Sequence, residues 1–243
     1  MSASHPGLSV WTRPRQRARP ALNRERIVAE AIALLDAEGI AALSMRTLGT
    51  RLNAGATSMY RHVASREELI ELAVDEVYGD IEVPVIEGVD QWRPAVIVCA
   101  ESYRRMILCH PWIAEALPGA GLAHLGPNML RLNESLFTVF AIAEFPIAEA
   151  HLAISTVLGY VVGVCLGEAS WLTLVARSGQ DEQSCAASML PVLERIAREH
   201  PRIGESIAAR GKSSVVEARD AKFRFGLERI LDGLETRLPG WSA

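Results

Sequence analysis

The sequence lacks the cysteine pattern of a disulfide-rich or zinc-binding protein. Its four cysteines include no CxxC pair and have no zinc-site spacing to the six histidines. Residues 1–22 contain no continuous apolar stretch of the kind that marks a secretory signal. We therefore expect reduced cysteines, no bound metal and a cytoplasmic location.

The motifs of several common enzyme classes are also missing. The chain has no glycine-rich phosphate loop, no HExxH and no GxSxG, and the acidic residues and histidines of its second half are scattered. No period-two pattern typical of a β-strand occurs beyond Pro84. These absences predict an all-α protein that is not an enzyme and needs no cofactor.

Lysine is nearly absent, and the charge is unevenly distributed. The 243 residues have a net charge of −4. However, residues 1–66 carry ten arginines against four acidic residues, while residues 67–243 carry 15 basic and 25 acidic residues. A basic N-terminal quarter is typical of a domain that meets a polyanion, whereas the acidic remainder favours solubility.

Helix signals punctuate the N-terminal part of the chain. Asn23 can cap a first helix, and Gly39 can end it. Ser44 can cap a second helix, and a third, from about Ala56 to His62, follows after a compact turn. Ser65 opens a capping box for a fourth helix, which we expect to reach as far as Pro84.

We predict three parts: a flexible arginine-rich arm at 1–22, a small helical domain at 23–84, and a larger all-α domain at 85–243. Residues 150–167 lack formal charge and approach the length of a membrane span. Their glycines, their acidic flanks and the absence of a neighbouring basic cluster argue against a span. We expect instead a helix covered partly by its own domain and partly by a partner subunit.

A short motif gives the first 80 residues a family resemblance. Residues 59–63 read Met-Tyr-Arg-His-Val and stand shortly before Arg-Glu-Glu-Leu at 66–69. With the helices around it, this segment resembles the helix-turn-helix domain of TetR/AcrR-type transcriptional repressors, over about residues 23–80. The chain departs from the family at Asn53, where Gly is usual, and at Gly55, where a polar cap is usual. Asn tolerates the left-handed conformation and Gly tolerates an N-cap, so both replacements fit.

The predicted DNA-binding surface uses both helices of this motif. Helical spacing turns Met59 and Val63 inward and leaves the opposite face of the third helix for base edges. The resemblance implies phosphate contacts from the aromatic and histidine side chains of that helix, and it favours Arg46 as a reader of guanine. The predicted DNA contacts are Ser44, Arg46, Thr47, Thr57, Ser58, Tyr60, Arg61, His62 and Arg66.

The second half resembles the effector-binding and dimerisation domain of the same family, through His-Pro-Trp at 110–112 and Gly-Pro-Asn at 126–128. Aligning Trp92 with the opening residue of the pocket helix in tetracycline-type repressors implies a ligand site along residues 91–109. The candidate ligand-binding residues are Cys99, Tyr103, Met106, His110, Trp112, Asn128, Leu132, Ser135 and Trp171. Each of them can equally be a core residue or a helix cap.

Two stripes suggest a homodimer. Glycines repeat every four residues along one helix, and large apolar residues repeat at helical spacing along the last helix. The predicted interface residues are Gly159, Gly163, Gly167, Phe223, Leu227, Ile230 and Leu234. The alternative is that both stripes are used inside the core of a single subunit.

Together these features predict a homodimeric repressor that binds a pseudo-palindromic double-stranded DNA operator and is released by a small-molecule effector. The fourth helix would link the effector site to the recognition helix, and no membrane contact is expected. The alternatives are a helical small-molecule-binding protein, a constitutive DNA binder without an effector switch, and a small all-α enzyme.

Overall fold

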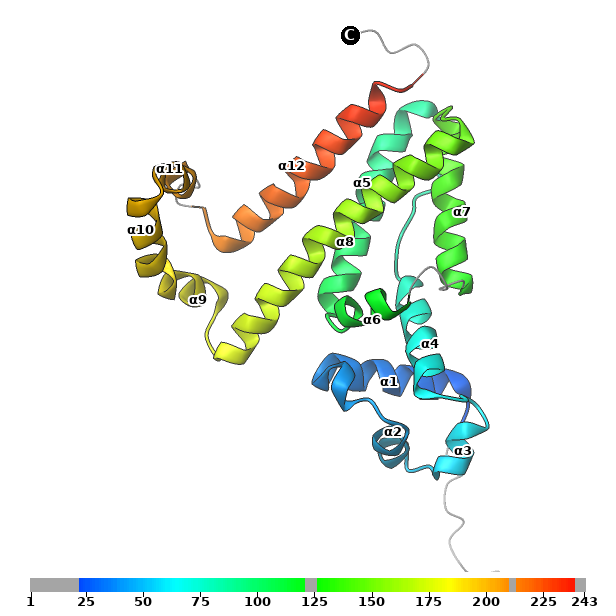
Figure 1. The fold of residues 1–243 in the computed structure, drawn as a ribbon. Helices are drawn as coiled ribbons and strands as arrows, with labels where there is room; N and C mark the ends of the chain where they lie inside the picture. Colours follow the sequence, from blue (N-terminus) through cyan, green and yellow to red (C-terminus); the bar gives the residue numbers. More distant parts are fainter. Residues whose placement is uncertain (1–21, 121–125, 210–212, 239–243) are drawn as a thin grey trace, which may run out of the picture.

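The computed structural model describes residues 22–120, 126–209 and 213–238, and within these ranges every regular element is a helix. The all-α prediction is therefore confirmed for the described residues. Helices α1–α4 form a small N-terminal unit, and a larger bundle above it contains α5–α8 and α12 (Figure 1). The arm predicted at residues 1–22 lies outside the described residues, except for its last position.

The N-terminal unit follows the local signals closely. Its helices are α1 (Arg24–Glu38), α2 (Met45–Leu52), α3 (Ala56–Tyr60) and α4 (Arg66–Tyr78), with a short 3-10 turn at Ile40–Ala42. The side chains of Asn23, Ser44 and Ser65 accept backbone N–H groups at the starts of α1, α2 and α4. These three predicted caps are confirmed, and each supplies an acceptor that the first helical turn lacks.

The turn between α2 and α3 is compact. Asn53 adopts the left-handed conformation with φ 50°, and Gly55 is the extended N-cap of α3. The Ala54 N–H donates to Gly49 O at 2.8 Å, and a Cβ on Gly49 would lie only 2.9 Å from Ala54 O. The fit of Asn53 and Gly55 is thus confirmed. Helix α3 ends at Tyr60, two residues earlier than predicted.

The larger bundle is built around one long helix. Its elements are α5 (Trp92–Cys109), α6 (Ile113–Ala120), α7 (Pro127–Ile142), α8 (Ile147–Ser178) and α12 (Val215–Glu235), with a 3-10 turn at Val89–Gln91. Helix α8 packs against α5, α7 and α12. Helix α4 ends at Tyr78 and does not reach Pro84 as predicted. Because α5 begins at Trp92, the domain boundary predicted at 84 falls in the connecting segment.

Helix α8 is long and apolar enough to cross a membrane by length and composition alone, with a mean hydropathy of 1.8. In this fold, one third of that apolar window is buried inside the subunit. The helix also carries Glu168, which is paired with Arg104 of α5 at 2.8 Å. The glycines at 159, 163 and 167 stay on its exposed side. Its composition is that of a helix that packs on one side.

Three short helices connect α8 to α12 and extend to one side of the bundle as the α9–α11 arm (Figure 1). Its helices are α9 (Glu182–Ser188), α10 (Leu190–Glu199) and α11 (Pro201–Ala209). Helices α10 and α11 pack against each other, and neither contains a fully buried residue. The arm exposes the large apolar side chains of Met189, Leu190, Val192 and Ile203.

Candidate nucleic-acid interface and effector cavity

The exposed surface of α2 and α3 carries most of the predicted DNA contacts. Met59 and Val63 are buried against Leu48, as helical spacing predicted. Thr57, Ser58 and Arg61 consequently lie on the exposed side of the α3 segment. This arrangement places hydroxyl and guanidinium groups where a base edge or a phosphate can reach them.

A groove separates α2 from α3. It has a volume of about 590 Å³ and is lined by Met45, Arg46, Gly49, Thr50, Asn53, Ala54, Gly55 and Tyr60. Arg46 is exposed, and Tyr60 keeps 53% of its surface accessible. Arg46 of α2, predicted to contact a base, and Tyr60 of α3, predicted to donate a hydrogen bond to a phosphate, therefore border the same groove.

Ser44 and Thr47 lie together at the start of α2. The Ser44 hydroxyl accepts the Thr47 N–H at 3.0 Å, and the two side-chain oxygens share a hydrogen bond of 2.7 Å. Both residues are half-buried. Their capping role is structural, and their contact with DNA stays a prediction.

Arg66 has partners inside the protein. Its Nε donates to Leu43 O at 2.8 Å, and its Nη2 donates to Ile40 O at 2.7 Å. These bonds attach the start of α4 to the segment that precedes α2. Nε and one N–H of Nη2 therefore donate inside the protein, and the phosphate clamp stays a prediction for the other N–H groups of the Arg66 guanidinium.

The end of the α3 segment is also held in place. Arg24 of α1 donates from Nε to His62 O at 3.4 Å and from Nη2 to Glu68 Oε1 at 2.8 Å. Glu68 Oε2 accepts the Ala64 N–H at 2.5 Å. Arg24 was not predicted as a positioning residue, because its two partners lie 38 and 44 residues away in the sequence and no local pattern connects them.

Two candidate ligand residues instead join the two domains. His110 Nδ1 and Trp112 Nε1 each lie 2.7 Å from Asp36 Oδ1 at the end of α1. Trp112 is only 3% exposed. His110 Nδ1 and Trp112 Nε1 thus face a carboxylate of the DNA-binding domain, and the ligand contacts of these two residues stay a prediction.

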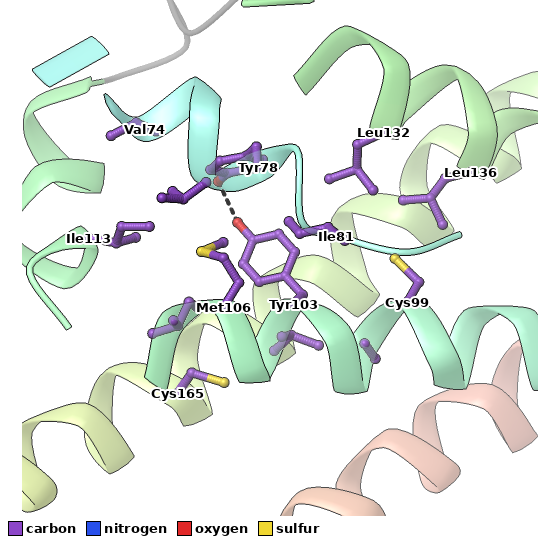
Figure 2. Packing of buried hydrophobic residues seen from close by; sticks show 14 of the residues in the cluster. Val74, Tyr78, Ile81, Cys99, Tyr103, Met106, Ile113, Leu132, Leu136 and Cys165 are labelled. Carbon is purple, nitrogen blue, oxygen red and sulfur yellow. Dashed lines mark hydrogen bonds between the residues drawn. The ribbon is translucent and has the colours of Figure 1, made fainter. Parts of the chain in front are cut away.

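The candidates on α5 lie in the packed interior of the larger domain (Figure 2). Cys99, Tyr103 and Met106 are buried along one face of the helix. The Tyr103 hydroxyl shares a 2.5 Å hydrogen bond with the Tyr78 hydroxyl of α4, and the two rings meet edge to face at 5.5 Å. Burial raises the pKa of both phenols above the ordinary value, so both stay protonated.

A cavity of about 480 Å³ lies between α5, α7 and α8. It is lined by Tyr103, Met129, Asn133, Phe137, His151, Ile154, Ser155, Leu158, Gly159, Val162 and Gly163. The His151 ring lies parallel to the Phe137 ring, with centroids 6.4 Å apart. Apolar walls with a few polar groups are typical of a small-molecule site.

Tyr103 is the one predicted ligand residue that lines this cavity. The α7 residues of the lining were not predicted, although Met129, Asn133 and Phe137 recur every four residues and so share one face of a helix. That spacing could indicate a ligand-binding face of a helix, but buried core residues of a helix show the same spacing. Only the packing of α7 beside α8 distinguishes the two.

The remaining ligand candidates lie elsewhere. Asn128 bonds to Asp75 of α4, Leu132 is fully buried in the core, and Ser135 is half-buried outside the cavity lining. Trp171 Nε1 donates to Glu182 Oε1 at 2.8 Å beside a separate cavity of about 960 Å³ between α8, α9 and α12. The predicted ligand residues therefore do not converge on one site.

The two sets of residues predicted to form the dimer interface differ in how exposed they are. A Cβ on Gly159, Gly163 or Gly167 would meet nothing within 4 Å, so this stripe is open. Phe223 and Leu227, in contrast, are 0% and 2% exposed inside the subunit's own core, and the prediction is wrong for these two residues. The residues that remain from the last helix, Ile230 and Leu234, are half-buried.

Comparison with known proteins divides the chain in the same way as the structure. Residues 27–73 match the family described as bacterial regulatory proteins, tetR family, and residues 83–238 match the tetracyclin repressor-like C-terminal domain. An HTH-type transcriptional regulator of Saccharopolyspora erythraea is 35% identical over 212 residues, with 86% of each chain covered. The HTH-type transcriptional repressor DrrR1 of Streptomyces coeruleorubidus is 30% identical, with 92% of this chain and 81% of the relative covered.

Among solved structures, the TetR family protein ActR of Streptomyces coelicolor in complex with actinorhodin superimposes with a TM-score of 0.73. It is 30% identical to this chain, and the match covers 90% of this chain and 98% of ActR. The similarity therefore extends over both the DNA-binding unit and the larger helical bundle.

Proposed function

This chain belongs to the TetR family of bacterial transcriptional regulators, and we propose that it works as a homodimeric repressor in the cytoplasm. Two copies of the α2–α3 unit bind the half-sites of a pseudo-palindromic operator. A small-molecule effector binds the larger domain and lowers the affinity for DNA.

The observation that carries this proposal is the exposed polar face of the helix-turn-helix. Arg46 of α2, Thr57 of α3 and Arg61 directly after α3 are exposed, while Leu48 and Met59 of the same helices are buried in the core. One short helix contacts only a few base pairs. Two-fold symmetry, with half-sites about one helical turn or a multiple apart, supplies the remaining specificity.

The cavity between α5, α7 and α8 supports the effector part of the proposal. Its Asn133, His151 and Ser155 offer hydrogen-bonding groups among apolar walls. We expect a small, largely apolar molecule with a few polar atoms. The actinorhodin complex of ActR supports ligand binding by a protein of this fold.

Tyr103 places the effector cavity next to α4. It lines the cavity and bonds to Tyr78 in the last turn of α4. A ligand that draws the Tyr103 hydroxyl away removes this bond between the two domains. Because coupling is reciprocal, the effector must then bind the free protein more tightly than the DNA complex.

The direct test is selection of duplexes from a random pool, followed by titration of the enriched duplex at fixed salt. Arg46→Ala should cost about 1–3 kcal/mol and relax the preference at one position. Tyr60→Ala should weaken all sequences about equally, because a phosphate contact carries no sequence information.

Arg51→Ala is the matched control on α2. Arg51 pairs with Glu30 and Glu38 of α1 at 2.6 and 3.5 Å, so its guanidinium faces the protein. This variant should keep the wild-type sequence preference. Failure of the wild-type protein to enrich any duplex would contradict the proposal as a whole.

A further inference from the structure

The N-terminus of α7 is capped by a carboxylate from α4. Asp75 Oδ1 accepts the backbone N–H groups of Asn128 and Met129, each at 3.1 Å, and Oδ2 accepts Asn128 Nδ2 at 3.3 Å. The residue in the N-cap position itself is Gly126, which has no side chain to offer. A Cβ there would overlap the Asp75 carboxylate. The glycine therefore makes room for a cap from another helix.

This cap fits the electrostatics of a helix start. The first-turn amides of α7 have no acceptor within the helix, and a negative charge is favourable at that end. Pro127 occupies the first position and has no N–H group, so the remaining donors point to Asp75. One carboxylate thus satisfies two backbone donors and one side-chain amide.

A second contact attaches α7 to the end of α4. Arg131 Nη2 donates to Gly79 O at 3.0 Å, directly after the last residue of α4. Asp75 and Gly79 are one turn apart, so α7 contacts the final turn of α4 at two points. The two helices are expected to move together.

The capped helix is also the one that lines the effector cavity. Met129 donates its N–H to Asp75, and its side chain lines the cavity together with Asn133 and Phe137. Met129 thus takes part both in the cavity wall and in a hydrogen bond to Asp75. A ligand that displaces α7 would therefore change the length of that hydrogen bond directly.

The other end of α4 holds the DNA-binding unit through Arg66, which bonds to Leu43 O and Ile40 O. We propose that Asp75 is the positioning residue that transmits the position of α7 to α4, and through α4 to the recognition helix. This inference rests on the proposed effector cavity. In this proposal, α4 changes position together with α7 and not with α5 alone.

Hydrogen exchange of the protein without DNA or ligand tests the link directly. In Asp75→Ala, the amides of Asn128 and Met129 should exchange about tenfold faster, because loss of a cap frees them. The inference requires the faster exchange to extend into α4 and the α2–α3 unit. Faster exchange confined to α7 would mean that the cap stabilises α7 locally, and it would overturn the inference.

Two variants control for a general loss of stability. Asp75→Asn keeps one acceptor oxygen and should restore part of the protection in α4. Glu71→Ala removes an exposed carboxylate one turn earlier on the same helix and should leave α7 and the α2–α3 unit unchanged. Equal effects of Asp75→Ala and Glu71→Ala would overturn the inference.

A double-mutant cycle tests transmission from the cavity side. Phe137→Ala opens the cavity wall about 15 Å along α7 from its start. It should change exchange in α4 at least about threefold in the wild-type background and not measurably in the Asp75→Ala background. Equal changes in both backgrounds would show that α4 responds through another contact.

The enriched duplex separates this inference from the proposed function. If the wild-type protein binds that duplex, Asp75→Ala should change the affinity by about fivefold or more, although the residue is on no DNA-facing surface. Unchanged affinity would overturn the inference and leave the proposed function standing. If no duplex is bound, the proposed function fails, and the exchange data alone decide whether Asp75 couples the two helices.

Discussion

The two domains differ in how completely one subunit buries its own apolar residues. In α1–α4, the apolar positions of every helix turn toward a shared interior that includes Leu34, Leu48 and Met59. In the larger domain, α8 leaves its glycine stripe open, and the α9–α11 arm exposes several large apolar side chains. The DNA-binding unit is complete as a monomer, whereas the larger domain has surfaces that suit a second subunit.

The contacts between the domains combine an apolar core, in which Val74 of α4 is buried with Met106 and Ile113, with directional polar bonds (Figure 2). They include Asp36 with His110 and Trp112, and Tyr78 with Tyr103. Directional bonds of this kind can be exchanged for bonds to a ligand or to water at small net cost.

The largest expected effect lies in the core of the larger domain. Arg104 donates to Glu168 at 2.8 Å and to Asp220 at 2.7 Å, and its guanidinium lies over the Phe223 ring. Arg104→Met leaves the Glu168 carboxylate, which is 6% exposed, without a counterion. We expect a loss of about 3–5 kcal/mol in the free energy of unfolding, measured by urea denaturation.

The matched control is the double variant Arg104→Met/Glu168→Leu, which removes both charges. It should recover most of the lost stability, because no uncompensated charge remains buried. If the single and double variants unfold at the same urea concentration, the pair is not the main stabilising contact between α5 and α8.

The next effect lies at the junction between the domains. Tyr103→Phe leaves the buried Tyr78 hydroxyl without its partner, which should cost about 1–3 kcal/mol. The double variant Tyr78→Phe/Tyr103→Phe removes both hydroxyls and should be closer to the wild type. Thermal unfolding monitored by circular dichroism gives the comparison. An unchanged unfolding temperature in Tyr103→Phe would indicate that water replaces the lost bond.

A smaller effect on subunit stability is expected at the open stripe of α8. Gly163→Leu introduces a side chain where a Cβ meets nothing, and it improves helix propensity by up to about 1 kcal/mol. The subunit should stay folded but sediment as a monomer. Because Gly163 also lines the cavity between α5, α7 and α8, the oligomeric state is the measurement that tests the interface. Ala176→Leu, exposed near the end of the same helix, should remain dimeric. A folded dimer of Gly163→Leu would place the interface elsewhere.

The smallest expected effect is a difference in reactivity among the four cysteine thiols. Burial raises the pKa of the Cys99 and Cys165 thiols to about 12, so almost no thiolate forms at about pH 8. Cys109 is exposed, whereas Cys185 is buried. Treatment of the folded protein with N-ethylmaleimide should therefore modify Cys109 first, as peptide mass spectrometry would show. Rapid modification of Cys99 would indicate that the interior around Tyr103 opens in solution.

The cavity that we propose as the effector site could be predicted only in part. Tyr103 was found because the resemblance placed it on the pocket helix, and it does line the cavity. Asn133 and His151 were missed, since polar residues on two different helices give no joint signal in a sequence. Phe223 and Leu227 were predicted as interface residues but are buried within the subunit. An apolar stripe on a helix has the same sequence pattern whether the core of its own subunit or a partner subunit covers it.

The sequence by itself determined the helix starts, the compact turn at Asn53 and the inward face of the recognition segment. These features depend on caps and spacings within a few residues, so the chain specifies them locally. Tertiary structure alone decided that His110 meets Asp36 across 74 residues and that Asp75 caps α7 across 53 residues. Such contacts depend on how whole helices pack, and that packing follows from the combined burial of many side chains rather than from any local pattern.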